Sequence, residues 1–286
     1  MKAREEKLQS ITTWGLNNPD VVIMLLTSSL VNPLAPIDGF SDLDIEIIFK
    51  DNSPYILQKK WLLNFGIPLA IIEEDEQAFE HMHAMKMVLY DDEVKVDFKL
   101  FSLPKFEKEI NKKTLHPDWD IGYKVLFDKS GITSKMAAPT YLASIIKKPN
   151  QQEFENLIYA FWWDTTYVAK CLKRGDIFYA KFMSESVIRT EYLTPLIEWY
   201  IAEKHDFTIT TNKHGRLFKK YLPTEIWNKI EKTFSAHEIP ENWSALFAMA
   251  DLVSQMGRYL AIKLNYIYPT EVEKNIRNYL LHVKNK

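Results

Sequence analysis

Residues 40–49 read Phe40-Ser-Asp-Leu-Asp-Ile-Glu-Ile-Ile-Phe49, an apolar run that carries an acid at every second position from 42 to 46. A β-strand sends alternate side chains to opposite faces, so the pattern predicts Asp42 and Asp44 on one face and their apolar neighbours in a core. Two like charges side by side repel each other unless a cation lies between them, and carboxylate oxygens suit Mg²⁺. Glu46 continues the acidic face, where a solvated acid is the favoured interpretation and a further metal ligand is the alternative.

Two other predicted strands carry polar residues at corresponding places. The run Val21-Val-Ile-Met-Leu-Leu-Thr-Ser-Ser29 predicts a buried strand that ends in two small hydroxyl residues. The run Glu93-Val-Lys-Val-Asp-Phe-Lys-Leu-Phe101 alternates, so Asp97 shares one face with Lys95 and Lys99 while the apolar residues share the other. The sequence therefore predicts an acidic pair and a lone acid on different strands.

The rest of the first half predicts short, mixed elements. The expected elements are helices at 5–16 and 53–64, a strand at 69–72, a hairpin of 85–90 with 94–101, and an edge strand at 124–127.

From Gln151 onward the pattern is long, helical and rich in aromatic residues. It predicts helices at about 151–174, 176–204, 223–234, 241–265 and 269–284, with Gly175 as a C-cap and prolines 240 and 269 at helix starts. The expected fold class is α+β, with a mixed sheet and flanking helices in residues 1–145 and an all-α bundle in residues 146–286.

Composition excludes several classes of protein. The chain has 286 residues, of which 36 are Lys or Arg and 38 are Asp or Glu, a balance unlike that of a nucleic-acid binder. A single cysteine, Cys171, excludes a disulfide framework. No apolar run approaches the length of a membrane span, and the N-terminus lacks the apolar segment of a signal peptide. We expect a cytoplasmic protein without nucleic-acid or membrane partners, either a monomer or a homodimer.

The order of a small-residue turn, a paired acid and a lone acid resembles the nucleotidyltransferase superfamily. Further motifs narrow the resemblance to the aminoglycoside 6-adenylyltransferases, the streptomycin-modifying family, and they run in order through both halves of the chain. These motifs are Phe40-Ser-Asp-Leu-Asp-Ile45, Trp61-Leu-Leu-Asn-Phe-Gly66, Met87-Val-Leu-Tyr-Asp-Asp92, Lys95-Val-Asp97, Lys148-Pro149, Glu153-Phe154, Phe161-Trp162, Thr166-Tyr-Val168 and Lys219-Lys-Tyr-Leu222.

The resemblance implies a Mg²⁺-dependent enzyme that transfers AMP from ATP to a hydroxyl of an aminoglycoside, streptomycin first, and releases pyrophosphate. It implies that Asp42, Asp44 and Asp97 hold two Mg²⁺ ions and that Asp97 also activates the acceptor hydroxyl. Ser28 and Ser29 would contact the triphosphate. The family usually has Gly-Ser-Arg where this chain has Ser28-Ser29-Leu30, so a glycine and a cation are replaced.

Other candidate residues lie in the second half of the chain. Lys213 and Lys219 are expected to reach the nucleotide, with a solvated basic surface as the alternative. Because streptomycin carries guanidinium groups, its pocket should offer acids and aromatic faces, and Trp162, Asp164 and Glu185 are the candidates. Tryptophans at helical spacing are nevertheless more often core residues. Two other functions stay open: a nucleotidyltransferase with another small acceptor, and a diverged nucleotide-binding homologue with little activity.

Overall fold

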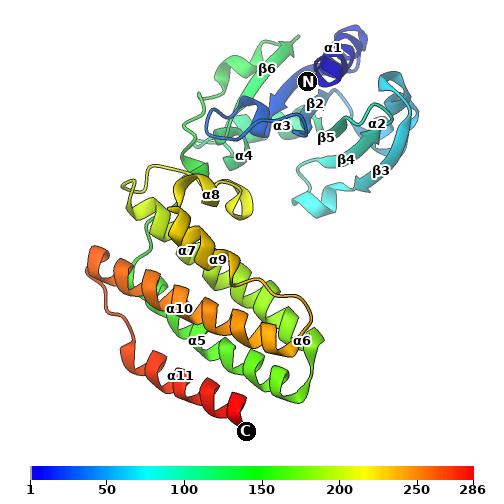
Figure 1. The fold of residues 1–286 in the computed structure, drawn as a ribbon. Coiled ribbons are helices and arrows are strands. Elements are labelled where there is room, and N and C mark those ends of the chain that lie inside the picture. Colours follow the sequence, from blue (N-terminus) through cyan, green and yellow to red (C-terminus); the bar gives the residue numbers. More distant parts are fainter. Residues whose placement is uncertain (1) are drawn as a thin grey trace. The chain divides into compact units, whose positions relative to one another are not determined.

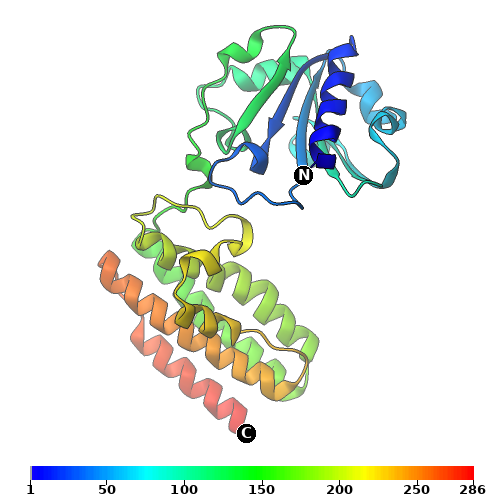
Figure 2. The same cartoon turned by 45° about the horizontal axis from the view of Figure 1, so that its top comes forward.

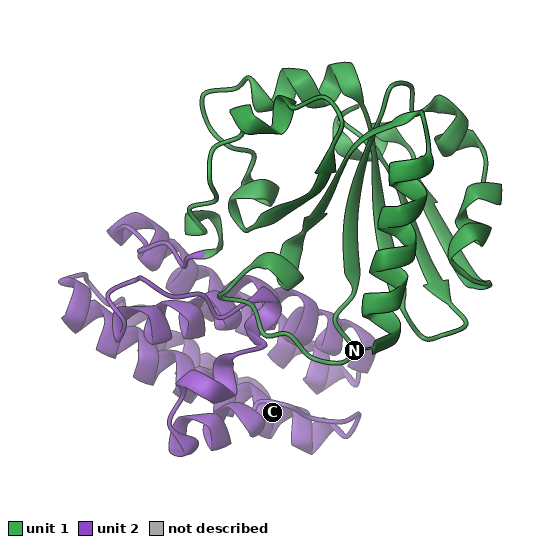
Figure 3. Cartoon of the chain, turned by 90° about the horizontal axis from the view of Figure 1, so that it is seen from above, with its two compact units in different colours: residues 1–144 green, residues 145–286 purple. Residues whose placement is uncertain are grey.

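The computed structural model of the protein describes residues 2–286, which divide into two compact units, Met1–Ser144 and Ile145–Lys286 (Figure 3). The sequence placed this boundary one residue later. The first unit is a mixed sheet with helices and the second is helical, so the expected α+β class is confirmed (Figure 1).

The sheet of the first unit has six strands in the order β3-β4-β5-β2-β1-β6. Strands β2 and β5 are parallel neighbours, and the other neighbouring pairs are antiparallel. The strands are β1 (Val21–Thr27), β2 (Leu43–Phe49), β3 (Pro68–Glu74), β4 (Ala84–Tyr90), β5 (Lys95–Ser102) and β6 (Tyr123–Asp128). The strands expected within the runs 21–29 and 40–49 are β1 and β2, and the expected strand at 124–127 is the edge strand β6.

Helices cover both faces of the sheet. Helix α1 (Lys2–Asn17) packs with the 3-10 segment η2 (Lys60–Phe65) over one face, where the core includes Ile45, Val96 and Phe98 (Figure 2). On the other face, α3 (Leu103–Ile110) and α4 (Pro117–Asp120) cover Leu25, Ile48 and Phe101. These two short helices were not expected from the sequence.

The helix expected at 53–64 is wrong. Helix α2 (Ser53–Leu57) ends at Gln58, which is extended, and η2 begins at Lys60. The indole N–H of Trp61 donates to the backbone carbonyls of Tyr55 and Gln58, both at 3.1 Å. The break lets Trp61 enter the core, where it is 8% exposed. Burial of a large aromatic ring outweighs the few hydrogen bonds of one more helical turn.

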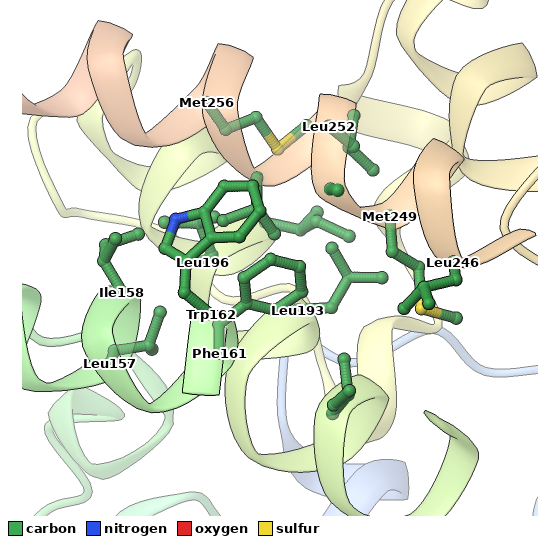
Figure 4. Close-up of a cluster of buried hydrophobic side chains, with 14 of the residues drawn as sticks. Leu157, Ile158, Phe161, Trp162, Leu193, Leu196, Leu246, Met249, Leu252 and Met256 are labelled. Carbon is green, nitrogen blue, oxygen red and sulfur yellow. The ribbon is translucent and has the colours of Figure 1, made fainter. Parts of the chain in front are cut away.

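The second unit is a bundle around one apolar core (Figure 4). Its helices are α5 (Gln151–Arg174), α6 (Ile177–Lys181), α7 (Thr194–Glu203), α8 (Phe218–Tyr221), α9 (Thr224–Glu231), α10 (Ile239–Leu264) and α11 (Thr270–Asn285). A single helix was expected at 176–204. The structure has three consecutive segments there: α6, a π-helical segment at Phe182–Leu193, and α7. Pro195 lies at the start of α7 and has no N–H to donate, which disfavours a regular helix through this point.

The helix expected at about 151–174, with Gly175 as its C-cap, is confirmed as α5. Asn150 and Glu153 form a reciprocal capping box at the start of α5. Gly175 ends the helix in the left-handed region at φ 78°. Over the described residues, every helix is too short or too polar to cross a bilayer.

Candidate functional site

The acids of β2 and β5 lie side by side on one face of the sheet. In the parallel register Asp44 pairs with Asp97, and Glu46 pairs with Lys99. Parallel partners point to the same face, so the carboxylates of Asp44 and Asp97 are neighbours. Asp42 comes just before β2, where its side chain is 41% exposed. The structure therefore brings together the three acids that the sequence singled out.

Lys95 is the cation of this group, and the sequence did not assign it a role. Its ammonium lies 3.1 Å from Asp42 Oδ2 and 3.0 Å from Asp97 Oδ2. Within residues 2–286, the side chains as placed leave no group of three His, Cys, Asp or Glu residues arranged to hold a metal ion. The lysine thus bridges two of the acids predicted as metal ligands.

Asp44 shows the electrostatic cost of this arrangement. Burial and the adjacent Asp97 raise the pKa of the Asp44 carboxyl to about 6, although Lys99 and a hydrogen bond from Ser28 act in the opposite direction. The raised pKa means that the site disfavours the charged form of Asp44, because its negative charge is not fully compensated. The site therefore favours additional positive charge.

The pairing register of β1 with β2 decides where Ser28 and Ser29 lie. Thr27, the last residue of β1, pairs with Asp44, so the next residues begin beside the acids. Ser28 has φ 65°, a conformation that glycine adopts freely and that costs other residues about 1–2 kcal/mol. The glycine that the aminoglycoside 6-adenylyltransferases usually have at this position would adopt this positive φ without strain. Here the hydroxyl of Ser28 bonds to Asp44 instead.

Glu46 belongs to a buried ionic network, so the expectation of a solvated acid is wrong. The residue is 1% exposed, and its Oε2 accepts a hydrogen bond from Trp119 Nε1 at 2.7 Å. Its Oε1 lies 3.3 Å from Lys99 Nζ, which also pairs with Asp118 at 2.9 Å. Burial disfavours the charged form of Lys99, but Glu46 and Asp118 outweigh it and raise the pKa of this ammonium. The network joins α4 to the strands that carry Asp44 and Asp97.

The sheet face that carries the acids becomes apolar on β4 and β3, the strands beyond β5. Met87 of β4 pairs with Asp97, and Ile72 of β3 pairs with Met87. Ile72 is 60% exposed and Leu89, also on β4, is 40% exposed. The acids thus lie between a hydroxyl-bearing strand end and an open apolar surface.

A pocket of about 630 Å³ in the same unit lies elsewhere. It is lined by η3 (Glu76–Phe79), the following loop, α3 and α4. Only Asp118 connects it to the ionic network of Lys99, and none of the three predicted aspartates lines it. The pocket is therefore not assigned to the chemistry of the acids.

The lysines predicted to bind nucleotide belong to the helical unit. Lys213 begins a short 3-10 turn and is exposed. Lys219 lies on α8, with its ammonium 5.5 Å from the centroid of the Trp227 ring. Their contact with a nucleotide stays a prediction.

The three residues predicted to bind the acceptor have different environments. Trp162 is fully buried and points into the core between the bundle helices, and its Nε1 donates to Tyr268 at 3.3 Å (Figure 4). Its ring is therefore a core element and has no surface to offer a ligand. Glu185 pairs with Arg189 at 2.5 Å. Asp164 lines a pocket together with the exposed Trp163.

Comparisons with known proteins relate nearly the whole chain to one family. A sequence model of the streptomycin adenylyltransferase family matches residues 1–283. An aminoglycoside 6-adenylyltransferase of Campylobacter jejuni is 28% identical to this chain, covering 100% of it and 97% of that protein. The protein of the same name from Staphylococcus aureus is 27% identical, covering 98% of each chain. The crystal structure of an aminoglycoside 6-adenyltransferase from Bacillus subtilis aligns over 99% of both chains, with 22% identity and a TM-score of 0.48.

Proposed function

This chain belongs to the streptomycin adenylyltransferase family and is a nucleotidyltransferase, and from that premise we propose that it transfers AMP from ATP to a hydroxyl of streptomycin. The observation that carries the proposal is the register of β2 with β5. It sets Asp44 beside Asp97, directly next to the strand end at Ser28. Phosphoryl transfer needs charge compensation and a proton acceptor at one place, and this group supplies carboxylates for both.

In the proposed reaction, the acceptor oxygen forms a bond to the α-phosphorus of ATP while the bond to the β-phosphate oxygen breaks. Pyrophosphate leaves, and the proton of the acceptor hydroxyl passes to Asp97. Lys95 lies beside Asp97 and supplies a positive charge next to the carboxylate that receives the proton. Ser28 and Ser29 would bind the triphosphate through hydroxyl and amide groups.

The acids fit Mg²⁺ by their chemistry. Their donors are carboxylate oxygens, and the raised pKa of Asp44 together with the bridging ammonium of Lys95 indicates a place that attracts cations. Asp42, Asp44 and Asp97 would hold the ions, two by analogy with the family. Bound Mg²⁺ would neutralise the triphosphate and stabilise the departing pyrophosphate. The number and identity of the ions, a cytoplasmic location and the oligomeric state stay predictions.

The test is transfer of labelled AMP by the purified chain with ATP, Mg²⁺ and streptomycin. We expect Asp97→Asn to lower the rate at least about 100-fold, because a positioned base contributes on the order of 10²–10⁴. ATP binding measured by calorimetry should change little. The control is Glu93→Gln, which alters an exposed acid in the turn before β5. Near-normal transfer by Asp97→Asn would refute its role as base.

The same assay separates the two other functions. A panel of aminoglycosides and other hydroxyl acceptors distinguishes streptomycin from another substrate, since only the preferred acceptor should give saturable transfer. Removal of Mg²⁺ with EDTA should stop the reaction, and added Mg²⁺ should restore it. A chain that binds no ATP at millimolar concentration would instead be a diverged homologue, in which Ser28 and Leu30 reflect lost chemistry.

A further inference from the structure

Helices α5 and α11 of the second unit lie side by side (Figure 1). Residues of both helices line a pocket of about 430 Å³. Its walls are built from this unit alone. The lining residues are Asn156, Tyr159, Ala160, Trp163 and Asp164 from α5, with Val272 and Ile276 from α11. Pockets of this size commonly hold small organic molecules.

Two of the lining residues present aromatic surface to water. Tyr159 is 50% exposed and Trp163 is 63% exposed, whereas the adjacent Trp162 is fully buried. Exposed aromatic rings that line a pocket offer the negative faces of their π-systems to a ligand. Trp163 is turned by about 100° around α5 from the buried Trp162, which takes most of its ring out of that core.

Asp164 is the one charged residue among the described residues that line this pocket. The hydroxyl of Tyr192 donates to its Oδ2 at 2.8 Å and holds the carboxylate in place. Burial, this hydrogen bond and the charge of Asp164 raise the pKa of Tyr192 to about 12, so the phenol stays a donor at neutral pH. A fixed carboxylate is therefore presented beside aromatic surface.

Within residues 2–286, the charge of Asp164 has no cationic side chain as a counter-ion. Over the described residues, Asp164 has no lysine, arginine or histidine within ion-pair distance. Arg277 follows Ile276 on α11, but its guanidinium bonds to Glu273 and Asp251, both at 2.8 Å. The ammonium of Lys170 lies 4.4 Å from the ring centroid of Tyr167. The neighbouring cations are thus engaged elsewhere.

We propose that this pocket binds a small organic cation, an amidinium, guanidinium or ammonium group on an apolar body. The cation would form a charge-assisted hydrogen bond with Asp164 and lie against the rings of Trp163 and Tyr159. Val272 and Ile276 would contact the apolar part. An anion would be repelled by the carboxylate, and a neutral apolar molecule would leave the charge of Asp164 without a partner. The proposal does not depend on the transfer reaction.

The test is calorimetric titration of the full chain with benzamidine, and with benzamide as a neutral molecule of the same shape. We expect saturable binding of benzamidine, with benzamide at least about tenfold weaker because it lacks the charge. Asp164→Asn keeps an oxygen that can accept from Tyr192 but removes the charge, and should weaken benzamidine binding about tenfold or more. Trp163→Leu should weaken it about threefold to tenfold.

Two controls separate this pocket from other acids. Glu155→Gln changes another acid exposed on α5 and should leave the affinity unchanged. Asp97→Asn should also leave it unchanged. Asp164→Glu keeps the charge and should retain more affinity than Asp164→Asn, with circular dichroism showing that each variant is folded. Equal binding of benzamidine and benzamide, or a loss of affinity in Asp97→Asn but not in Asp164→Asn, would overturn the proposal. So would a wild-type chain that shows no saturable binding below about 10 mM.

Discussion

Replacement of Glu46 tests how the ionic network supports the strands that carry the acids. Glu46→Ala removes the acceptor for Trp119 and one of the two acidic partners of Lys99. The remaining partner, Asp118, has a side chain that is 50% exposed. The Lys99 side chain is only 17% exposed, and its charged ammonium would keep one acidic partner instead of two.

The expected cost follows from the groups left unpaired. Breaking a buried ion pair by removing one partner costs about 3–5 kcal/mol, and a buried donor without an acceptor costs about 1–3 kcal/mol. Because Asp118 still compensates part of the charge of Lys99, we expect Glu46→Ala to lower the free energy of unfolding by about 3–4 kcal/mol. Glu46→Gln keeps an oxygen for Trp119 and should cost about 2 kcal/mol.

The assay is urea unfolding of the full chain, followed by circular dichroism. Glu6→Ala is the control, since its ion pair with Lys2 lies on the surface with Glu6 66% exposed. Such a pair should contribute about 0–1 kcal/mol. In the Glu46→Ala background, Lys99→Met removes a buried charge that is only partly compensated and should recover part of the stability. A free-energy cost of Glu46→Ala no larger than that of Glu6→Ala would contradict the role of the network. So would a cost of Lys99→Met in the Glu46→Ala background equal to its cost in the wild-type chain.

Two further predictions concern stability. Ser28→Ala loses the hydrogen bond to Asp44 but keeps the strained positive φ, whereas Ser28→Gly loses both the bond and the strain. In urea unfolding the glycine variant should therefore be more stable than the alanine variant by about 1 kcal/mol. A glycine variant no more stable than the alanine variant would contradict this. His83 is 3% exposed between the rings of Phe79 and Phe101, and its burial, with the nearby Lys99, lowers its pKa to about 4. A depressed histidine pKa gives stability that is present above pH about 6.5 and is lost as the pH falls toward 4, by up to about 1.4 kcal/mol per unit. His83→Phe should remove this part of the pH dependence of unfolding, and an unchanged slope would count against the assignment.

Local pattern was sufficient for the strands that carry the acids. The period of two in residues 42–49 and 94–101 is a property of each strand alone, so the face that holds Asp42, Asp44 and Asp97 could be predicted. Gly175 likewise marked the end of α5. These features depend on residues a few positions apart, whose geometry is fixed as soon as the element forms.

Glu46 and Lys95 show where local pattern was insufficient. Glu46 pairs with Leu25 of β1, and every residue of β1 is buried, so the same neighbourhood buries Glu46. The unbroken apolar run of β1 was a signal that both faces of that strand are covered. No comparable signal marked the ammonium of Lys95, which reaches Asp42 across 53 positions of sequence.

The sequence by itself determined the strands that carry the acids, the long helix α5, and which acids share a face, because hydrophobic period and capping act between near neighbours. Only the tertiary structure decided that β5 lies parallel to β2 with Asp97 beside Asp44, and that Trp162 fills the core while Trp163 stays exposed. Those outcomes depend on which elements pack together. That choice is set by the burial of whole faces summed over distant segments.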